Sequence, residues 1–279
     1  ERSPYWSDYQ TNGQYFGLLS FDPGEKKSVC YVDGDISEWN EDDNLIKEDI
    51  KLSVKYDEKF MYFLVKKENL DFSNDIIFIP IDTTQKTGSN YCKEYDAKFD
   101  READFLLVIN GIDNTRLLVQ ERYEALRSTY SQRINGFDTY RKENIPEKNS
   151  PIFVPINTIV EKKVLSENPL ERNIDILIET GKLLYGNANP ESQEFNSLAD
   201  FISAGDYIEI RIPWQLLNFS DPSRMQIHDD YYDGNYGKKN ITISEIYIGA
   251  GSKSERIALK KLKLKGWGNK VTYHERLKQ

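Results

Sequence analysis

Hydrophobic and polar residues alternate with a period of two along most of the chain, which is the pattern of half-buried β-strands. Residues 50–56 alternate in this way, Asp57 and Glu58 then turn the chain, and residues 60–65 continue as a second strand that is apolar on both faces. An apolar strand of this kind is typical of the covered centre of a sheet. We therefore predict a β-hairpin over residues 50–65 whose second strand lies centrally.

Further strands follow with the same alternation, and several positions are expected to interrupt them. Pro80 predicts a bulge or the end of the apolar strand over residues 76–82, because proline has no N–H to donate to a sheet. Residues 241–249 and 256–267 each change phase once midway, which predicts bulges. A second hairpin is expected around the Asn110–Gly111 pair.

Helical periodicity is thin in this sequence. The best helical segment is residues 121–134, where apolar side chains recur at helical spacing: Tyr123, Leu126, Tyr130 and Ile134. Many short strands without helices between them predict an all-β protein, an antiparallel β-sandwich with long loops and one short helix. We expect residues 1–28 to be a lead-in tail from a preceding domain and residues 29–279 to form one elaborated sandwich domain.

Composition excludes several classes of protein. The 46 acidic residues outnumber the 37 basic ones, and the resulting net charge of −9 repels a phosphate backbone, so no nucleic-acid partner is expected. No run of about 18 apolar residues is present, so we expect no membrane insertion. Cys30 and Cys92 form one disulfide or none, and two histidines are too few for a multi-histidine metal enzyme.

Three carboxylates are clustered in the sequence YVDGDISEWN, residues 31–40. Asp33 and Asp35 flank a glycine and Glu38 follows, and such a turn can gather a hard cation such as calcium, which binds oxygen ligands. The spacing is not that of an EF-hand, because Glu38 stands where that loop needs glycine. The alternative is that the acids and the glycine only form a turn, with Trp39 in the core.

The same stretch resembles the opening of family 9 carbohydrate-binding modules and, more broadly, the DOMON-like sandwich domains. In those families an acidic turn that ends in tryptophan precedes a hairpin, and here VDGDISEW (residues 32–39) precedes the hairpin of residues 50–65. NDIIFIPID and YIEIRIPWQLL match later strands. The resemblance implies a carbohydrate-binding sandwich with a structural calcium near Asp33, Asp35 and Glu38.

Two further parts of the chain, a long middle stretch and the N-terminal residues, bear on this resemblance. The chain is longer than those modules, and the extra length lies mainly between Ile112 and Asp206. Residues 4–24 resemble the junction that follows a glycosidase-like barrel in large bacterial proteins, some of which also carry a family 2 glycosyltransferase domain. This second resemblance implies the C-terminal accessory domain of an extracytoplasmic or cell-surface protein that acts on polysaccharides.

Aromatic residues supply the candidate sugar-binding surface. The chain has 18 Tyr, 13 Phe and 4 Trp, and an exposed ring can stack on the apolar face of a sugar while polar neighbours bind its hydroxyls. Loop-like sequence places four tyrosines among Asp, Asn and Lys residues: Tyr91, Tyr95, Tyr232 and Tyr236. The alternative for each tyrosine is packing inside the sandwich. Trp39 and Trp214 are expected in the core, whereas Trp267, between two glycines, is a candidate for exposure.

Catalysis has little support in the sequence. A glycosidase needs two acids across the scissile bond, and no acid here sits in a recognisable motif. A haem site through Met225 and His228 falls in a loop rich in Pro and Asp. There is also no GxSxG nucleophile motif, so we do not expect an enzyme.

The sequence therefore predicts a non-catalytic accessory module that binds a polysaccharide or oligosaccharide. The rival from another class is a structural domain that packs on a neighbouring catalytic domain and binds no free sugar. A sugar-binding module should expose several aromatic rings in one cleft, whereas a structural domain should expose an apolar patch near its N-terminal tail.

Overall fold

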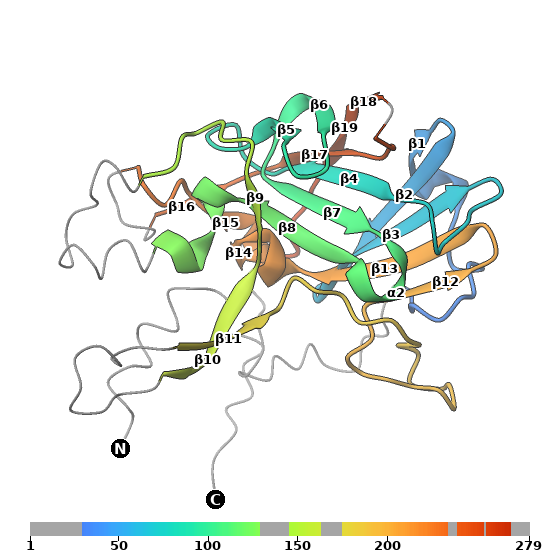
Figure 1. The fold of residues 1–279 in the computed structure, drawn as a ribbon. Coiled ribbons are helices and arrows are strands. Elements are labelled where there is room, and N and C mark those ends of the chain that lie inside the picture. The colour runs from blue at the N-terminus through green and yellow to red at the C-terminus, as the bar shows by residue number, and fades with distance from the viewer. Residues whose placement is uncertain (1–29, 129–144, 163–174, 234–238, 254, 269–279) are drawn as a thin grey trace, which may run out of the picture.

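Two antiparallel β-sheets packed face to face dominate the structure (Figure 1). It is a computed structural model that describes residues 30–128, 145–162, 175–233, 239–253 and 255–268. The predicted lead-in tail of residues 1–28 lies outside the described residues. The predicted all-β antiparallel sandwich is confirmed, since only short helical turns interrupt the strands.

One large sheet has five strands in the order β1-β2-β3-β13-β12. Its strands are β1 (Asn44–Lys47), β2 (Ile50–Tyr56), β3 (Phe60–Lys67), β12 (Phe201–Ala204) and β13 (Tyr207–Pro213). The predicted hairpin is β2–β3, in which Tyr56 pairs with Met61 across the turn. Residues 61–65 of β3 are all buried, because the sandwich core covers one face of the strand and the chain before β1 covers part of the other.

The other large sheet has six strands in the order β19-β17-β4-β7-β8-β9. Its strands are β4 (Ile77–Asp82), β7 (Phe105–Ile109), β8 (Arg116–Gln120), β9 (Phe153–Pro155), β17 (Glu245–Gly249) and β19 (Leu259–Lys263). The second predicted hairpin is β7–β8, and its connection is the helical turn α2 (Gly111–Asn114). Gly111 begins that turn with a φ of 63°, which glycine adopts without strain.

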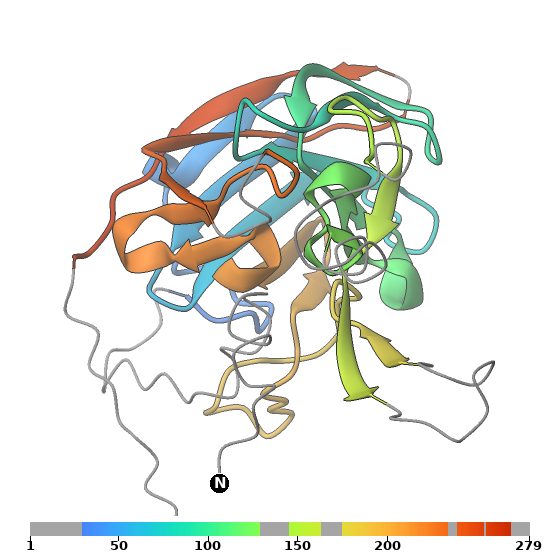
Figure 2. The same ribbon diagram turned by 90° about the vertical axis from the view of Figure 1, so that its left-hand side faces the viewer.

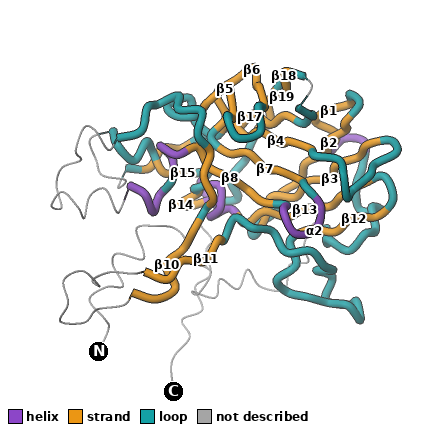
Figure 3. Tube along the Cα trace, viewed as in Figure 1, coloured by secondary structure: helices purple, strands orange, loops and turns teal. Residues whose placement is uncertain are grey.

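Three small sheets and several 3₁₀ turns complete the described chain, and loops connect them (Figure 3). The small sheets contain β5 (Ser89–Cys92), β6 (Ala97–Ala103) and β18 (Arg256–Ile257); β14 (Phe219–Asp221), β15 (Gln226–His228) and β16 (Asn240–Thr242); and the hairpin of β10 (Asn157–Lys162) and β11 (Asp175–Glu179). The 3₁₀ turns are Glu41–Asp43, Glu121–Tyr123, Trp214–Leu217 and Pro222–Arg224.

The main core lies between the two large sheets. Phe63 and Ile210 from the five-stranded sheet share this core with Ile79 and Leu107 from the six-stranded sheet. A second cluster covers the outer face of the six-stranded sheet with side chains from β5, β6 and β18. A third, small cluster lies on the outer face of the five-stranded sheet and contains Cys30, Val32, Tyr62, Ala188 and Ala199. Loops on that outer face are therefore anchored by few apolar contacts.

Several strand details differ from the sequence prediction. The predicted bulges in residues 241–249 and 256–267 are instead points where one strand ends and the next joins another sheet, so that β16 is followed by β17 and β18 by β19. Pro80 lies inside β4 opposite Leu106, without a register shift. The ladder between β4 and β17 is interrupted at Pro80, because proline has no N–H to donate.

The predicted helix over residues 121–134 is only partly described. A 3₁₀ turn at Glu121–Tyr123 precedes a helical turn at residues 125–128, and residues 129–134 lie outside the described residues. Tyr123 and Leu126 are both buried. Within the part of the chain that the structure describes, no helix has the length and apolar character needed to cross a membrane.

Candidate interaction surface

The acidic turn of residues 33–39 is held by one buried carboxylate from β13. The backbone N–H groups of Asp33 and Gly34 donate to Oε2 of Glu209, at 3.3 and 2.8 Å. The indole N–H of Trp39 donates to the other carboxylate oxygen, Oε1, at 2.9 Å. Glu209 is only 1% exposed, so these donors solvate its charge in place of water. We name residues 33–39 together with Glu209 the clamp.

Glycine is required at the centre of the clamp. Gly34 has a φ of 87°, a region in which a residue with a Cβ is strained. Its carbonyl accepts a hydrogen bond from the Tyr207 hydroxyl at 2.7 Å. Tyr207 and Glu209 are two positions apart on β13 and therefore point to the same face of the sheet. The polar side chains that alternate with the isoleucines of β13 thus bind the turn.

Two acids of the clamp region have raised pKa values. Burial raises the pKa of the Glu209 carboxyl to about 7, while the N–H groups of Trp39 and Gly34 act in the opposite direction. The pKa of Glu38 is also raised, first by burial and then by the charge of Asp33. Oε2 of Glu38 is buried, and none of the described residues offers it a hydrogen bond.

The predicted calcium ligands are engaged in local turns. Oδ1 of Asp33 accepts from the N–H of Asp35 at 2.8 Å, and Oδ1 of Asp35 accepts from the N–H of Ser37 at 2.9 Å. Over the described ranges, no group of three or more His, Cys, Asp or Glu side chains is placed to hold a metal ion. Calcium binding by Asp33, Asp35 and Glu38 therefore stays a prediction.

Two of the predicted sugar-binding tyrosines lie on the β5–β6 hairpin. Tyr91 is half-buried, and its hydroxyl donates to Oδ1 of Asp96 at 3.1 Å. Tyr95 is also half-buried and packs on Phe78, with ring centroids 5.5 Å apart. Tyr236 lies outside the described residues. The hairpin therefore keeps two tyrosines partly accessible next to polar groups.

Tyr232 lies in a turn outside the strands, as expected, but the expectation that it is exposed is wrong. Tyr232 is 8% exposed and belongs to the main core. Its neighbour Asp230 forms a buried ion pair with Arg122, with 2.8 Å between Oδ2 and Nη2. The guanidinium of Arg122 also lies over the Tyr232 ring, 5.3 Å from its centroid. The sequence HDDYYDG looks solvated because of its acids, and the buried ion pair is what permits it to be interior.

A wider ionic cluster surrounds that pair, and no motif in the sequence indicated it. Nζ of Lys86 lies 2.8 Å from Oδ2 of Asp229, whose side chain is 2% exposed. The Tyr123 hydroxyl donates to the backbone carbonyl of His228. Burial lowers the pKa of the His228 imidazole to about 4. The partners come from β15, the loop after β4 and the turn after β8, so the cluster fastens these elements together.

The three described tryptophans contribute little exposed aromatic surface. Trp214 is fully buried in the main core, as predicted. Trp39 is half-buried rather than fully buried, and its indole N–H donates to Glu209 in the clamp. Trp267 is also half-buried, and its ring centroid lies 6.3 Å from that of Trp214.

Exposed apolar side chains are instead concentrated in one stretch of the chain. Among the described residues, the large exposed hydrophobic side chains are Ile76, Ile112, Ile152, Leu177, Ile178, Leu184, Phe195 and Leu198. Five of these eight fall between Leu177 and Leu198, and Leu198 is 71% exposed. We name residues 177–198 the apolar segment. It lies within the extra length of chain that the resemblance to known modules did not cover.

The apolar segment begins on the hairpin β10–β11, which projects from the sandwich (Figures 1 and 2). Leu177 and Ile178 are neighbours on β11 and point to opposite faces, yet both are exposed. The base of the hairpin is tied down at Gly181, whose N–H donates to the carbonyl of Ile156 and whose carbonyl accepts from the N–H of Leu117. A two-stranded ribbon with apolar residues on both faces is marginal in water by itself.

The rest of the apolar segment is an ordered loop that leads into β12 (Figure 3). Nδ2 of Asn189 donates to Oδ2 of Asp33 at 2.7 Å, which ties the loop to the clamp. Nη2 of Arg211 donates to the carbonyl of Ser197 at 2.8 Å, which ties the loop to β13. Within the loop, the N–H of Asn196 donates to the carbonyl of Asn187 at 2.7 Å. These bonds hold the loop in place, and Leu183 anchors it in the main core, while Leu184, Phe195 and Leu198 stay exposed.

No protein-family model and no curated protein matches this chain. The resemblance to family 9 carbohydrate-binding modules and DOMON-like domains therefore stays a prediction.

Proposed function

We propose that this chain is a non-catalytic accessory module that docks on another protein, or on another domain of its own parent chain, through the apolar segment. One observation carries the proposal: five of the eight large exposed apolar side chains of the described chain fall within residues 177–198. Scattered single apolar residues are normal on a protein surface. Several exposed within 22 consecutive residues make this segment the strongest candidate for an interaction site among the described residues.

Hydrogen bonds fix the backbone of the loop, and a fixed loop is better suited to binding a partner than one that moves freely. Leu198 follows an Asx turn in which its own N–H donates to Oδ1 of Asn196 at 3.0 Å. Leu184 is fixed by its N–H, which donates to Oδ2 of Asp200 at 2.9 Å. These bonds fix the backbone at Leu184 and Leu198, so the two side chains start from fixed positions on the surface. Full burial of a Leu or Phe side chain contributes about 1.5–3 kcal/mol, so a partner gains several kcal/mol from covering them.

Capture of partners from an extract of the source organism tests this proposal. The baits are the wild-type chain, the double variant Phe195→Ser with Leu198→Ser, and the control Ile152→Ser. Ile152 is 45% exposed, the same fraction as Phe195, and lies outside the apolar segment. We expect a partner that wild type and control retain equally and that the double variant loses by about tenfold or more, as for a central contact residue. Equal capture by all three baits would contradict docking through this segment.

Glycan binding is the second candidate, and the β5–β6 hairpin favours it. Tyr91 and Tyr95 are partly accessible there, and Asp96 orients the Tyr91 hydroxyl. A glycan array tests this candidate with wild type and Tyr91→Ala. Binding to a polysaccharide that the variant loses while it stays folded supports a sugar site, because stacking residues contribute about 1 kcal/mol or more to recognition and little to stability. No binding by wild type leaves docking as the only candidate of the two.

A further inference from the structure

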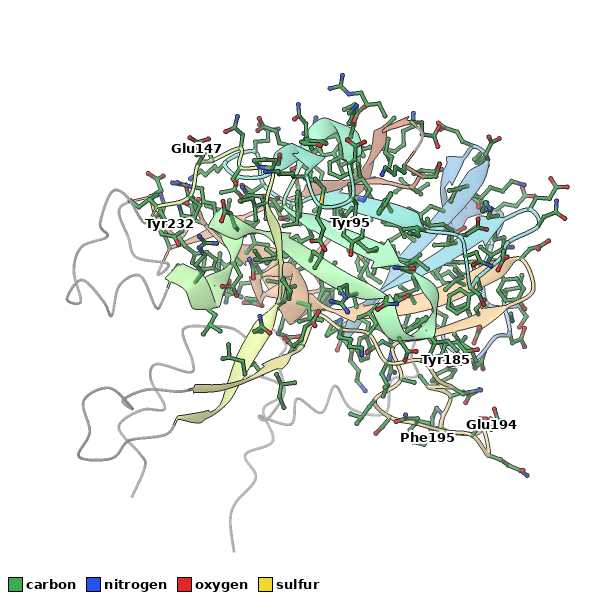
Figure 4. All side chains as sticks on the ribbon, viewed as in Figure 1. Tyr95, Glu147, Tyr185, Glu194, Phe195 and Tyr232 are labelled. Carbon is green, nitrogen blue, oxygen red and sulfur yellow. The ribbon has the colours of Figure 1, made fainter. Side chains whose placement is uncertain are left out.

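The tip of the loop combines apolar and acidic side chains. Glu194 and Phe195 are consecutive and lie together at the tip, below Tyr185 (Figure 4). Two tight turns form this tip, in which the N–H of Ser192 donates to the carbonyl of Asn189 and the N–H of Phe195 to the carbonyl of Ser192. Glu191 and Glu194 are therefore within a few residues of the most exposed apolar side chains.

These two glutamates are not neutralised by the described chain. Both side chains are exposed, and neither forms an ion pair within the described ranges. Other acids of the same region are occupied: Glu179 lies 3.5 Å from Arg116, and Asp200 accepts from the N–H of Leu184. Lys182, the exposed cation of the apolar segment, lies at the other end of the loop, where its backbone forms an isolated β-bridge with that of Arg116 on β8.

We propose that the partner presents apolar side chains flanked by lysine or arginine to the loop tip. This inference rests on the proposed docking function. A purely apolar partner would strip water from the Glu191 and Glu194 carboxylates without replacing it, which is costly, whereas a basic rim supplies the opposite charge. A second copy of this chain is disfavoured as the partner, because each copy carries a net charge of −9.

Two model peptides serve as probes of this partner chemistry. One is a short amphipathic helical peptide built from Leu and Lys, and the other has the same pattern with Glu in place of Lys. Fluorescence anisotropy with labelled peptides measures their affinity for wild type, for Glu191→Lys with Glu194→Lys, and for Phe195→Ser with Leu198→Ser. The charge control is Glu102→Lys with Glu255→Lys, which changes the net charge equally on exposed residues near β6 and β18.

We expect wild type to bind the Leu/Lys peptide about tenfold more tightly than the Leu/Glu peptide, with the preference weakening as salt rises. The charge variant at the loop tip should lose this preference, and the charge control should keep it. If the loop-tip charge variant binds like wild type while the apolar variant loses binding, the basic partner is ruled out and docking stands. If the apolar variant also binds like wild type, docking through this segment fails as well. Salt-sensitive dimers of the free chain would identify a second copy instead and overturn the inference.

Discussion

The clamp and the loop of the apolar segment lie on the same outer face of the five-stranded sheet, and Asp33 joins them through Asn189. Both are built from turns in which Asp or Asn side chains accept from the backbone. In the clamp, the polar groups turn inward onto Glu209. In the loop, the polar groups satisfy the loop's own backbone, and the apolar side chains face water. Similar turn chemistry thus fastens a turn to the sheet in one place and leaves apolar side chains exposed in the other.

Removing the carboxylate of the clamp should have the largest effect on stability. In Glu209→Ala, the N–H groups of Gly34 and Trp39 lose a buried acceptor, and each unsatisfied buried group costs about 1–3 kcal/mol. We expect the free energy of unfolding to fall by about 2–4 kcal/mol in urea titrations. Glu191→Ala, which removes an exposed glutamate from the loop, is the matched control and should stay within about 0.5 kcal/mol of wild type. A similar small loss in both variants would show that Glu209 does not hold the turn.

Calcium is the next test of the clamp. If Asp33, Asp35 and Glu38 bind it, a hundredfold excess over Kd adds about 2.7 kcal/mol of stability. The melting temperature should then rise by at least about 2 °C in calcium relative to chelator, and less in magnesium. Asp35→Ala should abolish this rise, since Asp35 is exposed and otherwise only caps Ser37. Identical melting curves in calcium and chelator would leave the acidic turn with its structural role alone.

The pH dependence of stability tests the role of Glu209 in the clamp. Burial raises the pKa of Glu209 from an ordinary 4.5 to about 7, so the folded chain binds more protons than the unfolded chain between these pH values. The contribution of Glu209 to the free energy of unfolding therefore falls as the pH rises through this window, by up to about 1.4 kcal/mol per pH unit. Wild type should lose stability relative to Glu209→Gln over the same range in urea titrations. A stability difference that does not change with pH would mean that the carboxylate is already ionised at the lower end.

The smallest expected effect on stability belongs to the apolar segment. Phe195 and Leu198 are 45% and 71% exposed, so serine at both positions removes part of the buried area of the phenylalanine and less of that of the leucine. The double variant should lose no more than about 1–2 kcal/mol of its free energy of unfolding while it loses the docking partner. Denaturant unfolding measures the first property and capture measures the second. A large loss of stability would show that these side chains pack on the sandwich.

Much of the fold was predictable because alternation determines which residues face the core. The hairpin β2–β3 and the buried Trp214 follow directly from that pattern. The changes of sheet after β16 and β18 were not predictable, since a phase change looks the same whether a strand bulges or leaves its sheet. The local pattern also says nothing about which distant element covers a polar face, and so the role of Glu209 on β13 was missed.

The candidate site was less predictable than the fold. The sequence placed Tyr232 on a loop because acids surround it, and only the pairing of Asp230 with the distant Arg122 explains its burial. Conversely, Leu184 and Leu198 look like ordinary core residues in the sequence, and their exposure depends on how the loop is tied to Asp33 and β13. Exposure of this kind is a property of tertiary contacts, not of local composition.

Hydrogen exchange of the chain, alone and with the partner that wild type captures, shows which surface the partner covers. Amides of residues 184–198 should exchange more slowly in the complex, because docking through the apolar segment covers them. Amides of the clamp at residues 33–39 should be almost unchanged. Protection confined to another face, such as the β5–β6 hairpin with Tyr91 and Tyr95, would contradict docking through the apolar segment.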